Sequence, residues 1–144
     1  MPSHHLFLAL ALAVLAPAAQ AQAPARPATF ELYVDEVYDQ LANGAVVFSV
    51  AFRDPLTRQS NPALRVQEGQ PVAIKVINRT SKTRSFAIMS VAGARSTPIR
   101  AGASGVIRFK APPIGSYIYN DPLQAATGET RTLFGDFVVQ ARKN

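Results

Sequence analysis

The chain has 144 residues, no cysteine and no tryptophan, and its 15 basic and 9 acidic residues give a net charge of +6. This length leaves room for one domain, and without cysteine no disulfide can hold it together, so packing alone must do so. The chain carries no nucleic-acid-binding motif, so its positive charge does not point to a nucleic-acid partner.

The N-terminus has the pattern of a signal peptide. Residues 6–16 form an apolar run too short to span a bilayer, and it is followed by Pro17 and the small residues Ala19 and Ala21. We expect residues 1–21 to be a signal peptide cleaved after Ala21, which predicts a periplasmic or secreted protein. Cleavage after Ala23 is less favourable because Pro24 would follow the cut, and an ordinary buried helix is the other interpretation.

Cleavage would remove both histidines, so the mature chain would contain no histidine, no cysteine and a single methionine, Met89. No second apolar run of membrane-spanning length follows, so no transmembrane segment is expected after cleavage.

Residues 22–28 are rich in proline and alanine and predict an extended linker, so the domain is expected over residues 29–144. Short apolar and alternating segments separated by turn residues then predict strands, and a short helix is expected around residues 123–127. The expected strands cover residues 30–34, 45–52, 63–66, 72–77, 85–91, 105–109, 116–119 and 134–139. This spacing predicts an all-β fold, a Greek-key β-sandwich of 7–8 strands.

Four residues at strand ends have identifiable structural roles in such a sandwich. Gly69 supplies a turn, and Asn78 ends a strand where its side chain can bond the backbone of the next loop. Tyr117 lies where a Greek-key sandwich places a corner tyrosine, and Gly135 allows close approach or a bulge in the last strand.

The order of these motifs resembles the cupredoxin superfamily, and in particular the N-terminal plastocyanin-like domain of multicopper oxidases. The resemblance covers roughly residues 45–140. It is carried by Leu64-Arg65-Val66 with Gly69 and Val72, by Val76-Ile77-Asn78, by Ile99 with Ala101-Gly102, by Ile107 with Phe109, and by residues 115–119 and 133–139.

The resemblance implies two His-x-His pairs that this chain does not have. Their positions are occupied by Ser85 and Ala87 in the first pair and by Asn120 and Pro122 in the second. Thiolate and imidazole ligands are what select copper in these proteins. We therefore expect degenerate ligand positions, no metal and no cofactor, although the family would imply copper. Met89 is expected to fill space in the hydrophobic core, as part of the strand over residues 85–91.

Other chemistry has little support in the sequence. Oxygen ligands for a hard cation occur, but they are scattered over a loop where turn formation is the simpler interpretation: Asn120, Asp121, Thr127, Glu129 and Asp136. After the expected cleavage, no histidine remains to activate a serine nucleophile. We therefore expect no catalytic residues and a protein that is not an enzyme, with an accessory part of an oxidoreductase as the alternative.

Charge and loop length instead suggest a binding surface. Residues 69–120 contain eight basic and no acidic residues, and residues 121–132 form a polar loop where cupredoxins present their ligand loop. The partner-binding candidates on these segments are Arg79, Lys82, Arg84, Asp121, Glu129 and Arg131.

Two functions are compatible with these observations. The first is an exported, copper-free cupredoxin-like accessory module that docks to an acidic protein partner or a membrane complex in the cell envelope. The second is a copper-binding or electron-transfer protein of the cupredoxin family whose site is completed by a partner chain.

Overall fold

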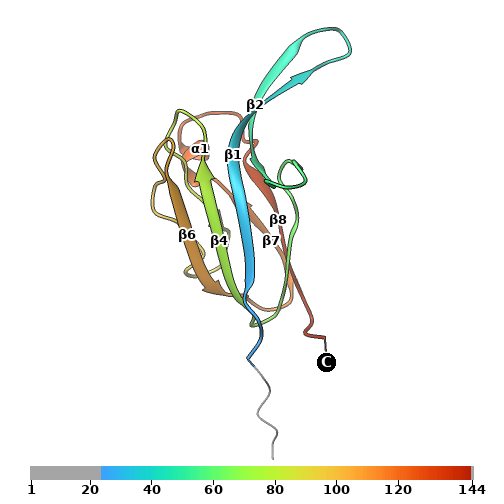
Figure 1. Cartoon of the computed structure of the whole chain (residues 1–144), viewed down its shortest axis with the longest axis vertical. Coiled ribbons are helices and arrows are strands. Elements are labelled where there is room, and N and C mark those ends of the chain that lie inside the picture. Colours follow the sequence, from blue (N-terminus) through green and yellow to red (C-terminus); the bar gives the residue numbers. More distant parts are fainter. Residues whose placement is uncertain (1–23, 144) are drawn as a thin grey trace, which may run out of the picture.

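The computed structural model describes residues 24–143, which form eight strands and one short helix (Figure 1). The strands are β1 (Ala28–Gln40), β2 (Val46–Arg53), β3 (Leu64–Gln67), β4 (Pro71–Asn78), β5 (Ala87–Ile88), β6 (Ser104–Lys110), β7 (Gly115–Asn120) and β8 (Phe134–Gln140), and the helix is α1 (Pro122–Ala126). The predicted all-β fold is therefore confirmed. The predicted signal peptide and its cleavage site lie outside the described residues.

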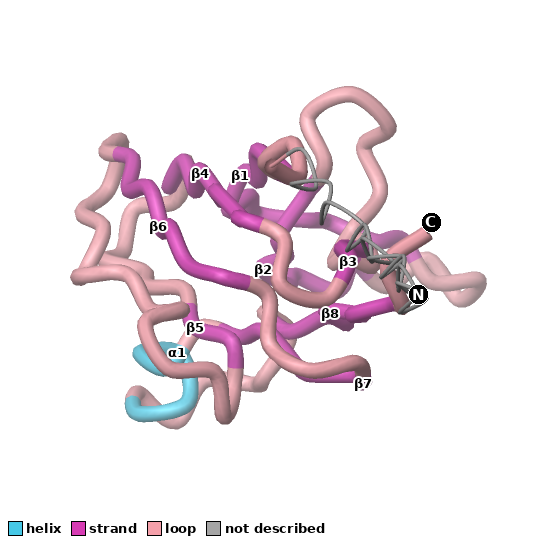
Figure 2. Tube along the Cα trace, turned by 90° about the horizontal axis from the view of Figure 1, so that it is seen from below, coloured by secondary structure: helices cyan, strands magenta, loops and turns pink. Residues whose placement is uncertain are grey.

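The strands form two four-stranded sheets, which Figure 2 shows as two layers. The first sheet has the order β2-β1-β4-β6, in which β1 runs parallel to β4 and antiparallel to β2. The second has the order β3-β8-β7-β5, in which β3 runs parallel to β8. The chain therefore crosses between the sheets several times, as in a Greek-key sandwich.

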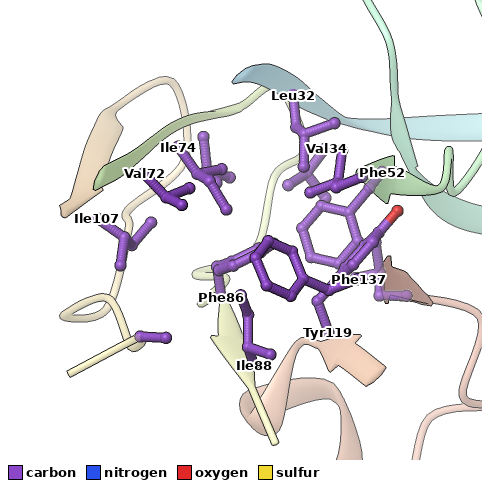
Figure 3. Packing of buried hydrophobic residues seen from close by; sticks show 14 of the residues in the cluster. Leu32, Val34, Phe52, Val72, Ile74, Phe86, Ile88, Ile107, Tyr119 and Phe137 are labelled. Atoms are coloured by element: carbon purple, nitrogen blue, oxygen red, sulfur yellow. The ribbon is translucent and has the colours of Figure 1, made fainter. Parts of the chain in front are cut away.

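The core lies between the two sheets and follows from alternation along the strands. In β4, for example, Val72, Ile74 and Val76 are buried while the residues between them are not. At one end of the core the rings of Phe52, Phe86 and Tyr119 pack together with centroids 5.4–5.5 Å apart (Figure 3). Such aromatic clusters combine a large buried apolar area with favourable ring geometry.

The structural roles predicted for single residues at strand ends are confirmed. Gly69 has a φ of +70° in the turn before β4, and the Tyr117 hydroxyl donates to the Pro113 carbonyl at 2.8 Å. Gly135 lies directly against the ring of Tyr119, with no room for a side chain. The structure describes the expected linker, residues 22–28, only from residue 24 onward. Within this part, the Arg26 carbonyl accepts a hydrogen bond from the Gln70 side chain.

The segment expected as a strand over residues 85–91 is mostly irregular. Only Ala87 and Ile88 form β5, because the chain turns at Ser90, which has a φ of +62°. This turn leaves Met89 52% exposed, so the expectation that Met89 fills the core is wrong.

The hairpin of β1 and β2 extends well beyond the rest of the sandwich, as Figure 1 shows at its upper edge. We call its outer part, residues 36–49, the arm. The arm carries exposed apolar side chains, namely Tyr38, Leu41, Val46, Val47 and Phe48. Within residues 24–143, no helix is long and apolar enough to cross a membrane.

Candidate functional site

The structure places the four degenerate ligand positions side by side. Ala87 on β5 pairs with Asn120 at the end of β7, and Ser85 contacts Asp121, the residue that precedes Pro122. These residues lie at the end of the sandwich formed by residues 79–87 and 120–133, which we call the loop end. The two segments that resemble ligand segments in the sequence are thus neighbours in space.

Asp121 is the centre of this arrangement and is buried. Its Oδ1 accepts hydrogen bonds from the Ser85 amide at 3.0 Å, from the Ser85 hydroxyl at 2.7 Å and from the Leu123 amide at 2.9 Å. The last of these bonds caps the N-terminus of α1, where a carboxylate is favoured. Asp121 therefore joins the segment before β5 to the helix after β7.

Arg84 supplies the positive charge that faces this carboxylate. Its Nη1 lies 3.8 Å from Asp121 Oδ2 and 2.9 Å from Glu129 Oε2, and its side chain is only 5% exposed. Within the described part of the chain, Oδ2 has no hydrogen-bond donor, so its attraction to Arg84 is purely ionic. Lys82, at the surface, forms a second ion pair with Glu129.

Asn78 holds the loop that carries these cations. Its buried amide donates to the carbonyls of Lys82 and Ile99 at 2.7 and 2.9 Å, and it accepts from the amide and hydroxyl of Thr80. Because this side chain forms four hydrogen bonds, it fixes the course of the loop over residues 79–84. The Thr80 hydroxyl in turn accepts from Arg84 Nε at 3.3 Å.

The partner-binding candidates divide into two groups in the structure. Arg84 and Asp121 are buried and form internal interactions, so they organise the loop end without reaching its surface. Lys82, Glu129 and Arg131 lie at the surface around it. Arg79 is half exposed, pairs with Asp35 at 3.1 Å and lies over the Tyr33 ring at 4.8 Å.

A groove of about 430 Å³ separates the loop end from the arm. Phe48 and Val50 line one side of it, and Lys82, Gln124 and Thr130 line the other. Gln124 and Thr130 belong to the polar loop expected from the sequence, whereas the arm was not expected. The signal for the arm was nevertheless present, because Val46, Val47 and Phe48 are consecutive apolar residues, whereas a surface strand normally alternates.

Hydrogen bonds from Lys82 and then from Arg84 lower the pKa of Glu129 below its ordinary value of 4.5. A carboxylate whose pKa is lower in the folded than in the unfolded state stabilises the folded state at pH values above its ordinary pKa. This contribution is lost as the pH falls through the pKa of the folded state. We expect the free energy of unfolding of Glu129→Gln to fall less steeply than that of the unaltered chain as the pH drops below 4.5. Urea titrations between about pH 3 and 7 measure this, and an identical pH dependence of the two proteins would contradict it.

The residues of the loop end do not fit a copper ion by themselves. The four positions offer a hydroxyl, a methyl group, an amide and a proline ring, and Asp121 Oδ1 already accepts three hydrogen bonds. Over residues 24–143, no three His, Cys, Asp or Glu side chains are grouped so that they could hold a metal. Copper sites in proteins are built from imidazole, thiolate and thioether ligands.

Comparison with known proteins decides the family. The family model described as "Multicopper oxidase" matches residues 58–144, which is more than half of the chain. The chain belongs to the multicopper oxidase family. A search of the curated proteins found no match.

Solved structures of multicopper oxidases share the fold. The multicopper oxidase from Campylobacter jejuni, a metallo-oxidase, superposes with a TM-score of 0.68 at 23% identity, over 82% of this chain and 26% of that one. The multicopper oxidase mgLAC gives 0.66 at 25% identity, over 83% and 40%. The blue copper oxidase from Nitrosomonas europaea gives 0.65 at 18% identity, over 83% and 40%. This chain therefore spans only about a quarter to two fifths of the length of these enzymes.

Family membership corrects two expectations. The expectations that the protein is not an enzyme and that it has no cofactor are both wrong at the level of the family, which consists of copper-dependent oxidases. Both were based on counting ligands in this chain alone. Because the chain matches only a fraction of each relative, the ligands of a single domain do not define the cofactor content of the whole protein.

Proposed function

We propose that this domain is the docking domain of an exported multicopper oxidase, in which its loop end packs against a copper-bearing cupredoxin domain. That second domain belongs either to the same longer protein or to a separate chain. The proposal includes export because residues 1–21 have the pattern of a signal peptide. The copper ligands, imidazoles above all, come in this proposal from the second domain.

The observation that carries the proposal is the construction of the loop end. Asp121 and Arg84 join its two segments from within, while Lys82 and Glu129 continue the same charge network to the surface. A surface whose side chains are already ordered loses less entropy when it binds than a mobile one. The network therefore gives the loop end the rigidity that a docking surface requires.

The charge around the loop end indicates which partner surface would fit. Arg79, Lys82 and Arg131 lie around it, and the nearby carboxylates Asp35 and Glu129 neutralise only part of that charge. An acidic patch on the copper-bearing domain would complement this rim. Such complementarity mainly raises the association rate and fixes orientation, and it weakens as salt is added.

The test is co-purification of a copper protein from envelope extracts of the native host with the affinity-tagged chain. We expect a near-stoichiometric copper-containing cupredoxin protein with oxidase activity, retained at low salt and released as salt is raised. Copper content, oxidation of Cu(I) and oxidation of a phenolic substrate are measured on the eluted complex.

Two charge variants make the result specific for the loop end. Arg131→Glu should weaken retention, whereas Lys110→Glu makes the same charge change at the opposite end of the sandwich, where Lys110 pairs with Pro71, and should not. The proposal fails if no copper protein is retained at low salt, or if the two variants weaken retention equally.

A further inference from the structure

A pocket of about 640 Å³ lies at the degenerate ligand positions. Three of these four positions, Ala87, Asn120 and Pro122, line it. Tyr119 points into the core, so its neighbour Asn120 lies on the opposite face of the sheet, together with its pairing partner Ala87. The pocket shares no lining residue with the groove between the arm and the loop end, so the two are separate features of the surface.

Hydrogen bonds hold the walls of this pocket in place. One wall is the loop over residues 88–94, which the Ile88 amide closes by donating to the Ala94 carbonyl at 2.9 Å. The Met89 amide joins the same loop to β7 by donating to the Ile118 carbonyl at 2.8 Å. Another wall is α1, whose N-terminus is capped by the buried carboxylate at the centre of the loop end. A pocket with fixed walls accepts a ligand without the entropic cost of ordering loops.

Most of the lining is apolar, and its small side chains create the hollow. Eight of the 13 lining residues are apolar, and four of these are alanines. The four polar side chains of the lining can all donate hydrogen bonds, and none of them is a carboxylate: Ser90, Arg95, Asn120 and Arg131. Pockets that bind small molecules have this composition, with apolar walls and a few polar groups that orient the ligand.

The two arginines of the pocket have no counter-ion among the residues that the structure describes. Arg95 belongs to the loop after β5 and Arg131 to the loop before β8, and neither takes part in an ion pair. Arg131 also lines a groove that contains Asp39, but it forms no ion pair with that carboxylate. Two guanidinium groups and no negative charge in one lining favour an anion, and the planar guanidinium matches a carboxylate best.

We propose that this pocket binds a small organic acid, whose carboxylate is held by Arg95 and Arg131 and whose apolar body lies against the alanine-rich walls. Met89, which is 52% exposed beside the pocket, would be covered by that apolar body. An inorganic anion would leave the apolar walls without a contact, and a neutral apolar molecule would leave both cations unpaired. Such binding is separate from the docking function, since neither copper nor a second protein takes part.

Titration of the purified chain with benzoate tests this proposal, measured by calorimetry and by the ¹³C-methyl NMR signal of Met89. The chain has two methionines, so Met89→Leu assigns the signal. Benzoate combines a carboxylate with an apolar ring, benzamide keeps the shape without the charge, and acetate keeps the charge without the ring. We expect saturable binding of benzoate at one site with a dissociation constant of about 1 mM, and binding at least roughly tenfold weaker for benzamide and acetate.

Two matched pairs of variants locate the site. Arg131→Gln should weaken benzoate binding roughly tenfold, because one of two charged donors is lost, whereas Arg108→Gln, on β6 of the other sheet, should not. Ala125→Leu should block binding by filling the pocket, whereas Ala126→Leu, at the next residue of α1, lies outside the lining and should not. Circular dichroism of each variant verifies that the sandwich is intact.

Three results would overturn the proposal. The first is the lack of saturable benzoate binding. The second is benzamide or acetate binding as tightly as benzoate, because the arginines or the apolar walls would then play no part. The third is a control variant that weakens binding as much as its matched variant does. A chain that retains a copper protein but binds no benzoate would refute only the pocket, and a chain that binds benzoate as expected without any co-purifying copper protein would refute only the docking function.

Discussion

Arg84→Met is expected to lower the free energy of unfolding by about 3–5 kcal/mol, because it leaves the carboxylate of Asp121 buried without a counter-ion. The Asp121 side chain is fully buried and the Arg84 side chain is 5% exposed, so water cannot replace the lost charge without opening the loop end. Methionine keeps most of the volume of the arginine stem, so the loss reflects charge and not a cavity. Urea unfolding followed by far-UV circular dichroism measures the change.

A second variant separates charge from packing at the same place. Arg84→Met combined with Asp121→Asn removes both buried charges, while the oxygen of the new side-chain amide can still accept the bonds from Ser85 and Leu123. We expect this double variant to be more stable than Arg84→Met alone. Lys82→Met, at the exposed end of the same network, should cost about 0–1 kcal/mol. A single Arg84→Met loss as small as that of Lys82→Met would show that the Arg84–Asp121 pair is not what holds the loop end together.

Gly135→Ala is expected to destabilise the domain by about 3 kcal/mol, at the upper end of what overpacking usually costs. A Cβ atom at this position would lie 2.3 Å from the ring and hydroxyl of Tyr119, the cross-strand neighbour of Gly135. The Tyr119 ring has no room to move away, since it packs against Phe52 and Phe86 and its hydroxyl donates to the Pro62 carbonyl at 2.7 Å. Either the strands must separate or the aromatic cluster must repack.

Gly115→Ala is the matched control, because Gly115 is also a strand glycine that faces a tyrosine. There the nearest atom to a new Cβ would be Tyr117 Cε2 at 3.6 Å, an ordinary van der Waals distance, and the backbone is not in the left-handed region. We expect a change within about 0.5 kcal/mol. Adding Tyr119→Leu to Gly135→Ala should cost less than the sum of the two single changes, since leucine frees the space that the Cβ needs. If the losses in stability from the two changes were additive, the strain in Gly135→Ala would not arise from contact between the new Cβ and the Tyr119 ring.

The fold was predictable because alternation and turn residues are local signals. The strands β4, β6, β7 and β8 begin and end within about two residues of the expected bounds, and Asn78, Tyr117 and Gly135 have the roles expected of them. The segment around Met89 was not predictable in the same way. Its apolar residues suit a strand, but a backbone with positive φ at Ser90 ends β5 after Ile88, and serine at this position gives no warning of that.

The candidate site was predictable only in part. Motif order located Ser85 and Asn120, and the structure brings their segments together, but no sequence pattern shows that Asp121 and Arg84 are buried. Charged residues in loops are normally exposed, so their burial follows from tertiary packing alone. The expectations about enzyme and cofactor were wrong for a different reason, since they treated a chain that matches part of its relatives as if it were the whole.

The parallel pairing of β3 with β8 has a consequence for how the domain folds. Leu64 finds its backbone partner only at Phe137, and β7 likewise pairs with β8, so the second sheet cannot assemble until the last strand is present. Contacts this distant along the chain slow folding, because a long loop must close before any of them forms. The first sheet, complete once Lys110 has been made, would meanwhile expose its inner face. If the first sheet formed before β8 was available, its apolar inner face would be open to association with other chains, so late pairing of β8 is the step that protects this domain from aggregation.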